Sequence, residues 1–422
     1  MSQEPRMISQ VGSEVDQSSG PSPDDVRTKW PAGLKRRILH FTPSWFAVNM
    51  GTGISSILLH NSPYTFTGLT EIATAIFLIN VVLFTLFLLT TIARYCLYPT
   101  VLSTMLFHPV QSLFLGCLPM GFATIVNMTV FVAAEPWGGR WITFAWALWW
   151  IDVALSVTVA IGVPFFVFTR HQHSPSLNTV SPAWLLPIVA PNVASASGGI
   201  VATVLPAAQA RLTIMISYLL WGSVPIALMI MTLVYLRMAI HKVPLATEIF
   251  SVLLPVGACG QGSFALLQLA YSSLDHTRSN SKWLDNGAVI PADSAIGVAS
   301  SVWAGSVVIA FVVWAVGIFW ISIALFSIID TAIDSKIPFN MGWWGLTFPL
   351  GTHAVAASTF GKQLNSEAFK IVGTIESLVV VLLWLYIGTM TVIKSIDGSV
   401  FVAPCLGPTG QPPKEAPRKQ RN

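Results

Sequence analysis

LPMGFATI, at residues 118–125, returns with small changes as LPIVAPNVASASGG (186–199), LPVGACGQGS (254–263) and FPLGTHAVAAS (348–358). A looser version, TPSWFAVNMGTG, occupies residues 42–53. Each places a proline in or beside a long apolar run and follows it with small residues. Proline lacks a backbone donor and clashes with the preceding helical turn, which hydrocarbon tolerates only where protein or a water-filled cavity satisfies the freed groups. The pattern predicts five kinked helices around a pore.

The composition is that of a membrane protein. Hydrophobic residues make up 54% of the chain and charged residues only 9%, against roughly 25% charged in soluble domains. The mean hydropathy is +0.69. The net charge of +4 comes from the tails and from loops on one side, so it does not indicate a nucleic-acid partner. The four cysteines show no metal-ligand spacing, and we expect neither a metal nor a cofactor.

The chain divides into ten apolar segments of spanning length, for which about 20 residues are needed, flanked by two polar tails. We expect an all-α membrane domain over 41–395, a disordered N-tail over 1–40 and a basic C-tail over 396–422. The predicted segments are 44–60, 69–97, 111–134, 141–169, 183–204, 212–240, 247–272, 294–328, 341–361 and 369–393.

Odd and even segments differ in character. The odd segments are rich in Gly, Pro, Ala and Ser, whereas the even ones are longer and more apolar, as in IATAIFLINVVLFTLFLLT (72–90). We therefore expect five helical hairpins, with the odd helices inside and the even helices facing lipid. Lys and Arg are more numerous on the side of the N-terminus, and this bias predicts that both termini are cytoplasmic.

The odd segments carry few polar side chains and no Lys, Arg or Asp in their central stretches. The predicted kinks are at Pro43, Pro119, Pro187, Pro255 and Pro349. The candidates for lining the pore and binding substrate are Asn49, Thr52, Thr124, Asn127, Asn192, Gln261, Ser263 and His353. Amides and hydroxyls suit a weakly charged anion. They also commonly join helices to one another, and both roles stay open here. An arginine clamp for a dicarboxylate is missing.

Four further side chains in the apolar segments each have two possible roles. Phe348 directly precedes Pro349, so a kink there turns a large ring towards the axis, where it either packs or gates the pore. His353 is either a proton-sensitive pore residue or a packed one. Asp152 and Glu376 lie in even segments, where we favour structural pairing or a neutral, protonated state over a transport role.

The proline-containing sequence motifs resemble those of the tellurite-resistance/dicarboxylate transporter family, and the resemblance extends over residues 40–395. The resemblance rests on TPSWFAVNMGTG, LGCLPMGFATI (115–125), WLLPIVAPNVAS (184–195), LLPVGACGQGS (253–263) and WWGLTFPLG (343–351). The family includes bacterial tellurite-resistance channels, yeast malic acid permeases and plant slow anion channels. Within it, PMGFATI and GQGSFALLQL look most like fungal sulfite efflux pumps.

The resemblance implies a homotrimer whose protomers each enclose a pore lined by the odd helices, with Phe348 as the gate. The function expected is export of sulfite or bisulfite across the plasma membrane, with no bond chemistry. A malate or other dicarboxylate permease is the alternative within the same class. An integral-membrane enzyme and a receptor are alternatives of other classes.

Overall fold

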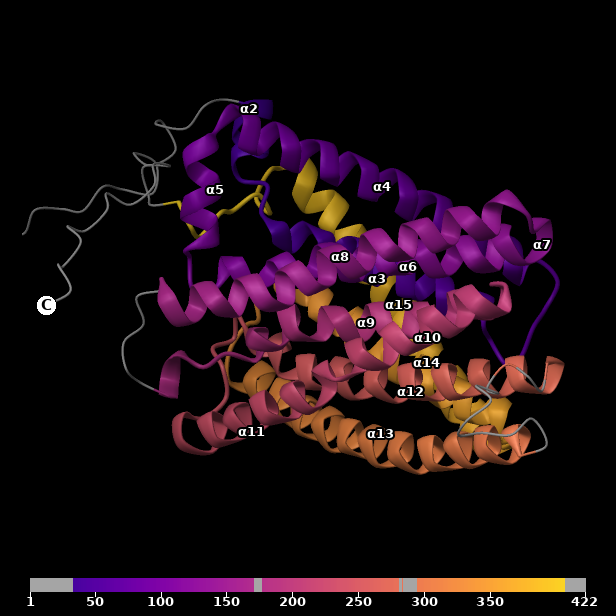
Figure 1. Cartoon of the computed structure of the whole chain (residues 1–422). Helices are drawn as coiled ribbons and strands as arrows, with labels where there is room; N and C mark the ends of the chain where they lie inside the picture. Colours follow the sequence, from indigo (N-terminus) through magenta and orange to yellow (C-terminus); the bar gives the residue numbers. More distant parts are fainter. Residues whose placement is uncertain (1–32, 171–176, 281–282, 284–293, 407–422) are drawn as a thin grey trace, which may run out of the picture.

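A computed structural model describes residues 33–170, 177–280, 283 and 294–406. All regular secondary structure in these ranges is helical, and most helices run along one common direction (Figure 1). The main helices overlap the predicted segments, although two helices divide the predicted segment 212–240 and the helix predicted over 294–328 extends to Asp334. Two short helices, α2 (Leu34–Leu39) and α5 (Pro99–Leu106), lie between the main ones, and α7 (Glu135–Trp137) continues the helix before it through a π-helical turn, Val130–Ala134.

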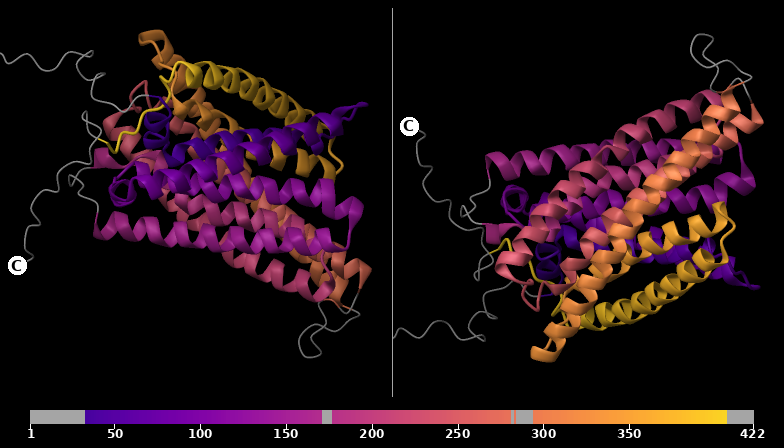
Figure 2. Two further views of the ribbon diagram at one scale, coloured as in Figure 1. Left: turned by 90° about the horizontal axis from the view of Figure 1, so that it is seen from above. Right: turned by 90° about the horizontal axis from the view of Figure 1, so that it is seen from below.

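Five helices form the centre of the molecule and the others surround them. The central helices are α3 (Phe46–His60), α6 (Cys117–Thr129), α9 (Leu185–Ala202), α12 (Leu254–Ser279) and α14 (Thr347–Gln363). The peripheral helices are α4 (Leu69–Leu97), α8 (Arg140–Thr169), α10 (Ala207–Trp221) with α11 (Ser223–His241), α13 (Ala295–Asp334) and α15 (Glu367–Ile396). The longest, α13, crosses one face obliquely (Figure 2).

Burial separates the two sets of helices as the sequence predicts. In the described chain, eight helical stretches are long and apolar enough to cross a membrane. The three that contain α6, α9 and α12 are 78–100% buried in their most apolar window, whereas the five peripheral ones are 17–39% buried. The two remaining central helices, α3 and α14, have only 15 and 17 residues and are mostly buried. That all ten segments cross the bilayer stays a prediction.

The central helices form a closed ring in the order α3, α6, α9, α12, α14 and back to α3. Close approach at each of the five interfaces depends on a glycine. A Cβ on Gly260 of α12, for example, would collide with the backbone of Thr352 and His353 on α14. The glycines at the five interfaces are Gly121, Gly116, Gly199, Gly257 with Gly260, and Gly351. Small residues bring membrane helices into van der Waals contact in this way.

Each signature proline lies at the start of its helix. Short 3₁₀ segments precede the central helices: η1 (Pro43–Trp45), η2 (Gln111–Gly116), η5 (Pro182–Trp184), η6 (Ile249–Leu253) and η8 (Met341–Leu346). Pro43 opens η1, and the other four signature prolines are the second or third residue of an α-helix. In that first turn proline costs little, because its missing N–H has little or no intrahelical partner to lose. The prolines therefore mark 3₁₀-to-α junctions rather than breaks in mid-helix.

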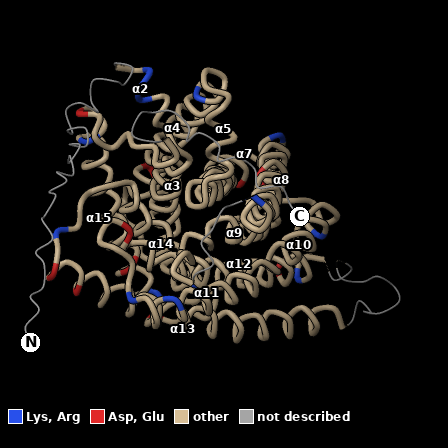
Figure 3. The backbone as a smooth tube through the Cα atoms, turned by 90° about the vertical axis from the view of Figure 1, so that its left-hand side faces the viewer, with Lys and Arg blue, Asp and Glu red and all other residues tan. Residues whose placement is uncertain are grey.

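The two ends of the described chain pack together at one end of the bundle, called here the α2 end. Arg37 donates to the carbonyl of Ile396 at 3.0 Å, and the Ala403 amide donates to Nδ1 of His40 at 3.0 Å. Residues 34–39, which the sequence places in a disordered tail, form α2 because these contacts hold them. The predicted disorder of 1–32 falls outside the described residues. Seen from this end, charged residues lie mainly around the margin (Figure 3).

Candidate functional site

The five central helices meet at a small cavity close to their first turns. Every residue that lines it is apolar, and each of the five helices contributes at least one. The lining residues, called here the neck, are Met50, Met120, Leu185, Leu186, Val189, Leu254, Gly257, Phe348 and Pro349. Because the first residues of four helices and the fifth residue of α3 surround one point, the five helices run parallel from it. The positive ends of their dipoles therefore all face the α2 end.

The neck is too narrow for an oxyanion in this structure. The cavity measures about 20 Å³, and a single water needs at least about 10–15 Å³ measured in this way. Phe348 is the largest side chain in the neck and is 4% exposed. It is the second residue of α14, so the η8-to-α14 junction at Pro349 sets the position of its ring. The ring thus lines the cavity where the five central helices meet, and its role as a gate stays a prediction.

Three predicted amide side chains lie two helical turns beyond the neck. Asn127, Asn192 and Gln261 each follow a neck residue of their own helix by seven positions. Seven residues rotate an α-helix almost back to the same face and advance it by about 10 Å. The helices concerned, α6, α9 and α12, are successive neighbours in the ring. These three residues, called here the amide set, therefore share one level and one side of the axis.

The amide set is buried and has unused hydrogen-bonding capacity. Asn127, Asn192 and Gln261 are 1–5% exposed. The Asn192 side chain donates to the carbonyl of Ala258 at 3.5 Å, which leaves its Oδ1 pointing elsewhere. Within the described residues, neither that oxygen nor Oδ1 of Asn127 has a hydrogen-bond partner. A buried acceptor without a donor costs about 1–3 kcal/mol, so a water or substrate that supplies a donor is favoured at this level.

Hydrogen bonds direct other predicted lining residues away from the axis. Asn49 on α3 donates to Oδ1 of Asn80 on peripheral α4 at 3.0 Å, and Asn80 donates to the Thr124 hydroxyl on α6 at 3.1 Å. Thr52 accepts from the indole of Trp384 at 3.1 Å. These bonds join central helices to peripheral ones. Joining helices was one of the two roles that the sequence allowed for these polar side chains.

Ser263 and His353 also face peripheral helices. Ser263 donates to the carbonyl of Ala310 on α13 at 2.6 Å. Nδ1 of His353 lies 3.1 Å from both carboxylate oxygens of Glu376 on α15. The pairing expected for Glu376 is thus present. Of the eight polar candidates, the three of the amide set have no hydrogen bond to a peripheral helix among the described residues, and they stay our candidates for lining a pore.

Charge is scarce near the axis. In the described chain the one fully buried arginine is Arg94, near the α2 end of peripheral α4, where it donates to the Leu39 carbonyl and the Tyr95 hydroxyl. It is therefore engaged away from the amide set. Asp152 on α8 is fully buried, and neither carboxylate oxygen has a hydrogen-bond partner among the described residues. No arginine clamp for a dicarboxylate is found in the described part of the ring.

Apart from Phe348 and Pro349, sequence reasoning missed the apolar residues of the neck, and it also missed the bridging residue Asn80. The repeated phrase contained a signal for the neck, because Leu186, Leu254 and Phe348 each directly precede the signature proline of their segment. Asn80 was also detectable as a lone amide in the very apolar stretch 72–90. Met50 and Met120 had no comparable signal, since isolated methionines are common in membrane helices.

Comparison with known proteins gives a consistent result. The chain is 44% identical over 366 residues to a protein of Arthroderma benhamiae named sulfite efflux pump SSU1, covering 86% of this chain and 93% of that one. A protein of the same name from Candida albicans is 28% identical over 80% of this chain and 70% of its own length.

A more distant relative carries a different name. The malic acid transport protein of Schizosaccharomyces pombe is 24% identical over 83% of this chain and 78% of its own length. These relatives are named as transporters and not as enzymes. The resemblance to fungal sulfite efflux pumps stated from the sequence motifs is confirmed. The family model described as voltage-dependent anion channel (SLAC1) matches residues 40–392, and the chain therefore belongs to this family of membrane proteins.

Proposed function

We propose that the protein exports sulfite or bisulfite through a pore along the axis of the five central helices. The single observation that carries this proposal is the convergence of all five helices on one apolar neck, with the amide set two turns beyond it. The similarity to named sulfite efflux pumps supports the choice of anion. Export by a pore needs neither a cofactor nor bond chemistry.

Phe348 is the gate in this proposal. Its ring is the largest group in a neck of about 20 Å³, so a path opens only when the ring moves. Apolar constrictions close pores by excluding water. The neighbouring Gly257 has no side chain, and its α-carbon faces Pro349. This close contact holds Pro349, and with it the start of α14, against α12, so that gating in this proposal is a motion of the Phe348 ring.

The amide set provides a physical basis for selecting bisulfite. Its side-chain N–H groups donate to the oxygens of the anion, and the free Oδ1 atoms of Asn127 and Asn192 accept from a hydroxyl. Bisulfite in its hydroxyl form carries both kinds of partner, whereas chloride and nitrate carry no donor. Sites that hydrogen-bond a substrate hydroxyl discriminate against analogues that lack it.

The membrane potential is sufficient to drive export. With the α2 end in the cytoplasm, the five positive helix ends face the internal anion pool. An inside-negative potential contributes about 2.3 kcal/mol per charge per 100 mV, which corresponds to roughly fifty-fold accumulation of a monoanion outside. This proposal includes cytoplasmic termini, ten membrane crossings arranged as five hairpins, a plasma-membrane location and a homotrimer with one pore in each protomer.

Anion flux into proteoliposomes tests the function. Purified protein is reconstituted, a potential is imposed, and the fluxes of sulfite, chloride, nitrate and malate are compared. We expect sulfite to move along the electrical gradient, and malate neither to move nor to compete. Malate flux that exceeds sulfite flux would favour the dicarboxylate permease suggested by the Schizosaccharomyces pombe relative. No flux of any anion above that of empty vesicles would refute a transport role.

A further inference from the structure

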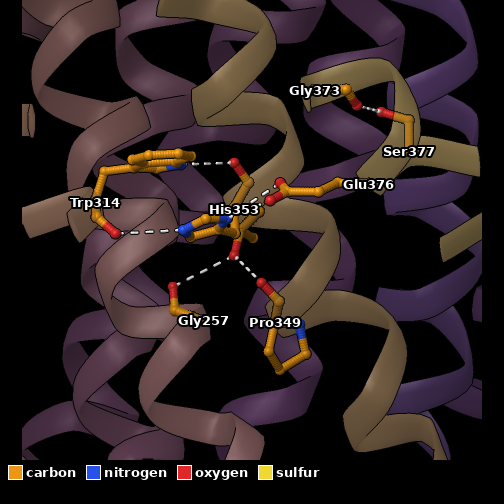
Figure 4. A network of polar contacts seen from close by, with 8 residues as sticks. Gly257, Trp314, Pro349, His353, Gly373, Glu376 and Ser377 are labelled. Carbon is orange, nitrogen blue, oxygen red and sulfur yellow. Dashed lines mark hydrogen bonds and ion pairs between the residues drawn. The ribbon is translucent and has the colours of Figure 1, made fainter. Parts of the chain in front are cut away.

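His353 lies in a compartment built by glycines between one central and two peripheral helices. A Cβ on Gly317 of α13 would lie 2.8 Å from Cδ2 and 3.0 Å from Nε2 of the imidazole, so only glycine leaves room for the ring there. Gly373 of α15 approaches the backbone of Ser358 on α14, one turn before Glu376. This contact brings α15 close enough for Glu376 to reach His353 (Figure 4).

The contacts of His353 fix where protons lie. Nε2 is 3.3 Å from the carbonyl of Trp314, and a carbonyl oxygen only accepts, so Nε2 carries a proton. Nδ1 faces both oxygens of Glu376 at 3.1 Å. One further proton is therefore needed between Nδ1 and the carboxylate, held by either group. With this proton, His353 and Glu376 together carry no net charge. Without it, the lone pair on Nδ1 of His353 faces the negatively charged carboxylate of Glu376 inside the membrane.

The same helix carries the neck residue Phe348, five positions before His353. Between them, the Thr352 hydroxyl contacts the carbonyls of Pro349, at 2.9 Å, and of the neck residue Gly257, at 3.4 Å. On its other side, α14 contacts α13 through His353. The imidazole ring stacks on the indole of Trp314, with 4.6 Å between the ring centres. The His353 contacts therefore fix the rotation and depth of the helix that positions Phe348.

We propose that His353 and Glu376 form a one-proton clamp that positions Phe348, and that loss of this proton at alkaline pH lowers transport. The titratable group that contacts His353 in the described chain is Glu376 from α15, and Cys259 of α12 borders the same glycine, Gly317. From α13, His353 meets Trp314 and Gly317, which do not titrate. Deprotonation removes the Nδ1 contact, frees α14 and adds a negative charge beside a path for anions.

Glu376→Gln tests the clamp, because a glutamine amide donates to Nδ1 as the protonated pair does but cannot lose its proton. The matched control is Glu367→Gln, at the exposed start of the same helix, where the carboxylate pairs with Lys370. Flux of each variant is divided by parent flux at the same pH, so that titration of sulfite itself cancels. For Glu376→Gln we expect a ratio near one under acidic conditions and a several-fold rise on alkalinisation; for the control, a constant ratio.

A second readout does not depend on transport, which matters because the flux assay rests on the proposed function. The melting temperature of the parent should fall relative to that of Glu376→Gln as pH rises, while the difference from the control stays constant. Nitrogen NMR of the histidine-labelled parent covers the case in which the variant fails to fold, with the His353 ring-nitrogen signals expected to change as the pair loses its proton on alkalinisation. Flat flux ratios and melting differences, or an unchanging His353 signal, would overturn the proposal.

Discussion

Phe348 and His353 lie five residues apart on α14, with the Phe348 ring at the axial neck and the His353 ring on the opposite, peripheral side against Trp314. One helix thus links the lining of the central cavity to a partly buried His353–Glu376 pair with α15. Everything that fixes α14 against its neighbours also fixes the neck.

Replacing Gly260 by Ala should separate α12 from α14. The added methyl group would collide with the backbone of Thr352 and His353, and backbone cannot give way as a flexible side chain can. We expect a loss of about 1–3 kcal/mol in stability, as for other overpacked sites, measured as a lower melting temperature. Gly305→Ala on α13 is the control, because nothing lies within 4 Å of its added Cβ. Equal melting temperatures for the two variants would contradict the close packing of the ring.

Replacing Gln261 by Met should impair transport without impairing folding. The two side chains have similar length and volume, and Gln261 lies at the level of the amide set rather than in a bond between helices. Sulfite flux should fall, and the preference for sulfite over nitrate should weaken. In contrast, Asn49→Leu should lower stability by about 1–2 kcal/mol and leave selectivity unchanged, because Asn49 bonds Asn80. Normal sulfite selectivity in well-folded Gln261→Met would remove this residue from the pore.

Acidification should release the C-terminal segment from α2. Burial, with Arg36 and Arg94 as smaller causes, lowers the pKa of His40 from 6.5 to about 4. The docked state favours the neutral ring, whose Nδ1 accepts from the Ala403 amide. Docking is therefore fully stable above about pH 6.5 and weakens as pH falls towards about 4.

Hydrogen exchange of the Ala403 amide measures this release. After correction for the intrinsic pH dependence of exchange, its protection should decline across that window. His40→Asn should flatten the decline, because an asparagine oxygen accepts but does not titrate. Constant protection of Ala403 in the parent from neutral to acidic pH would show that His40 does not hold the segment.

The sequence predicted the architecture better than the direction of polar side chains. Proline and small-residue content distinguished central from peripheral helices, because a lipid-facing surface needs bulky apolar groups and a tight ring needs glycines such as Gly260. The residue before the proline also placed Phe348 at the axis. A side chain such as Asn49 was not predictable, since an amide suits both a pore and a bond between helices.

What the single sequence lacked was the register between helices. Asn49 turns towards Asn80, and His353 towards Glu376, because those partners lie at matching heights on α4 and α15. Matching heights depend on how loops and glycine contacts set each helix along its neighbour. Asn127 and Gln261 each follow a neck residue of their own helix by seven positions, and they share one level because Met120 and Leu254 already lie together at the neck.

The most direct test of the central pore is the anion current carried by Phe348→Ala. The substitution removes the largest ring from the neck and adds no charge, so passive conductance should rise and discrimination between sulfite and nitrate should fall. The control is Phe326→Ala on α13, because the side chain of Phe326 is 68% exposed. Its anion current should equal that of the parent. A loss of sulfite flux would indicate a transporter that packs substrate against the ring. Current equal to that of the parent in correctly folded Phe348→Ala would contradict the gate.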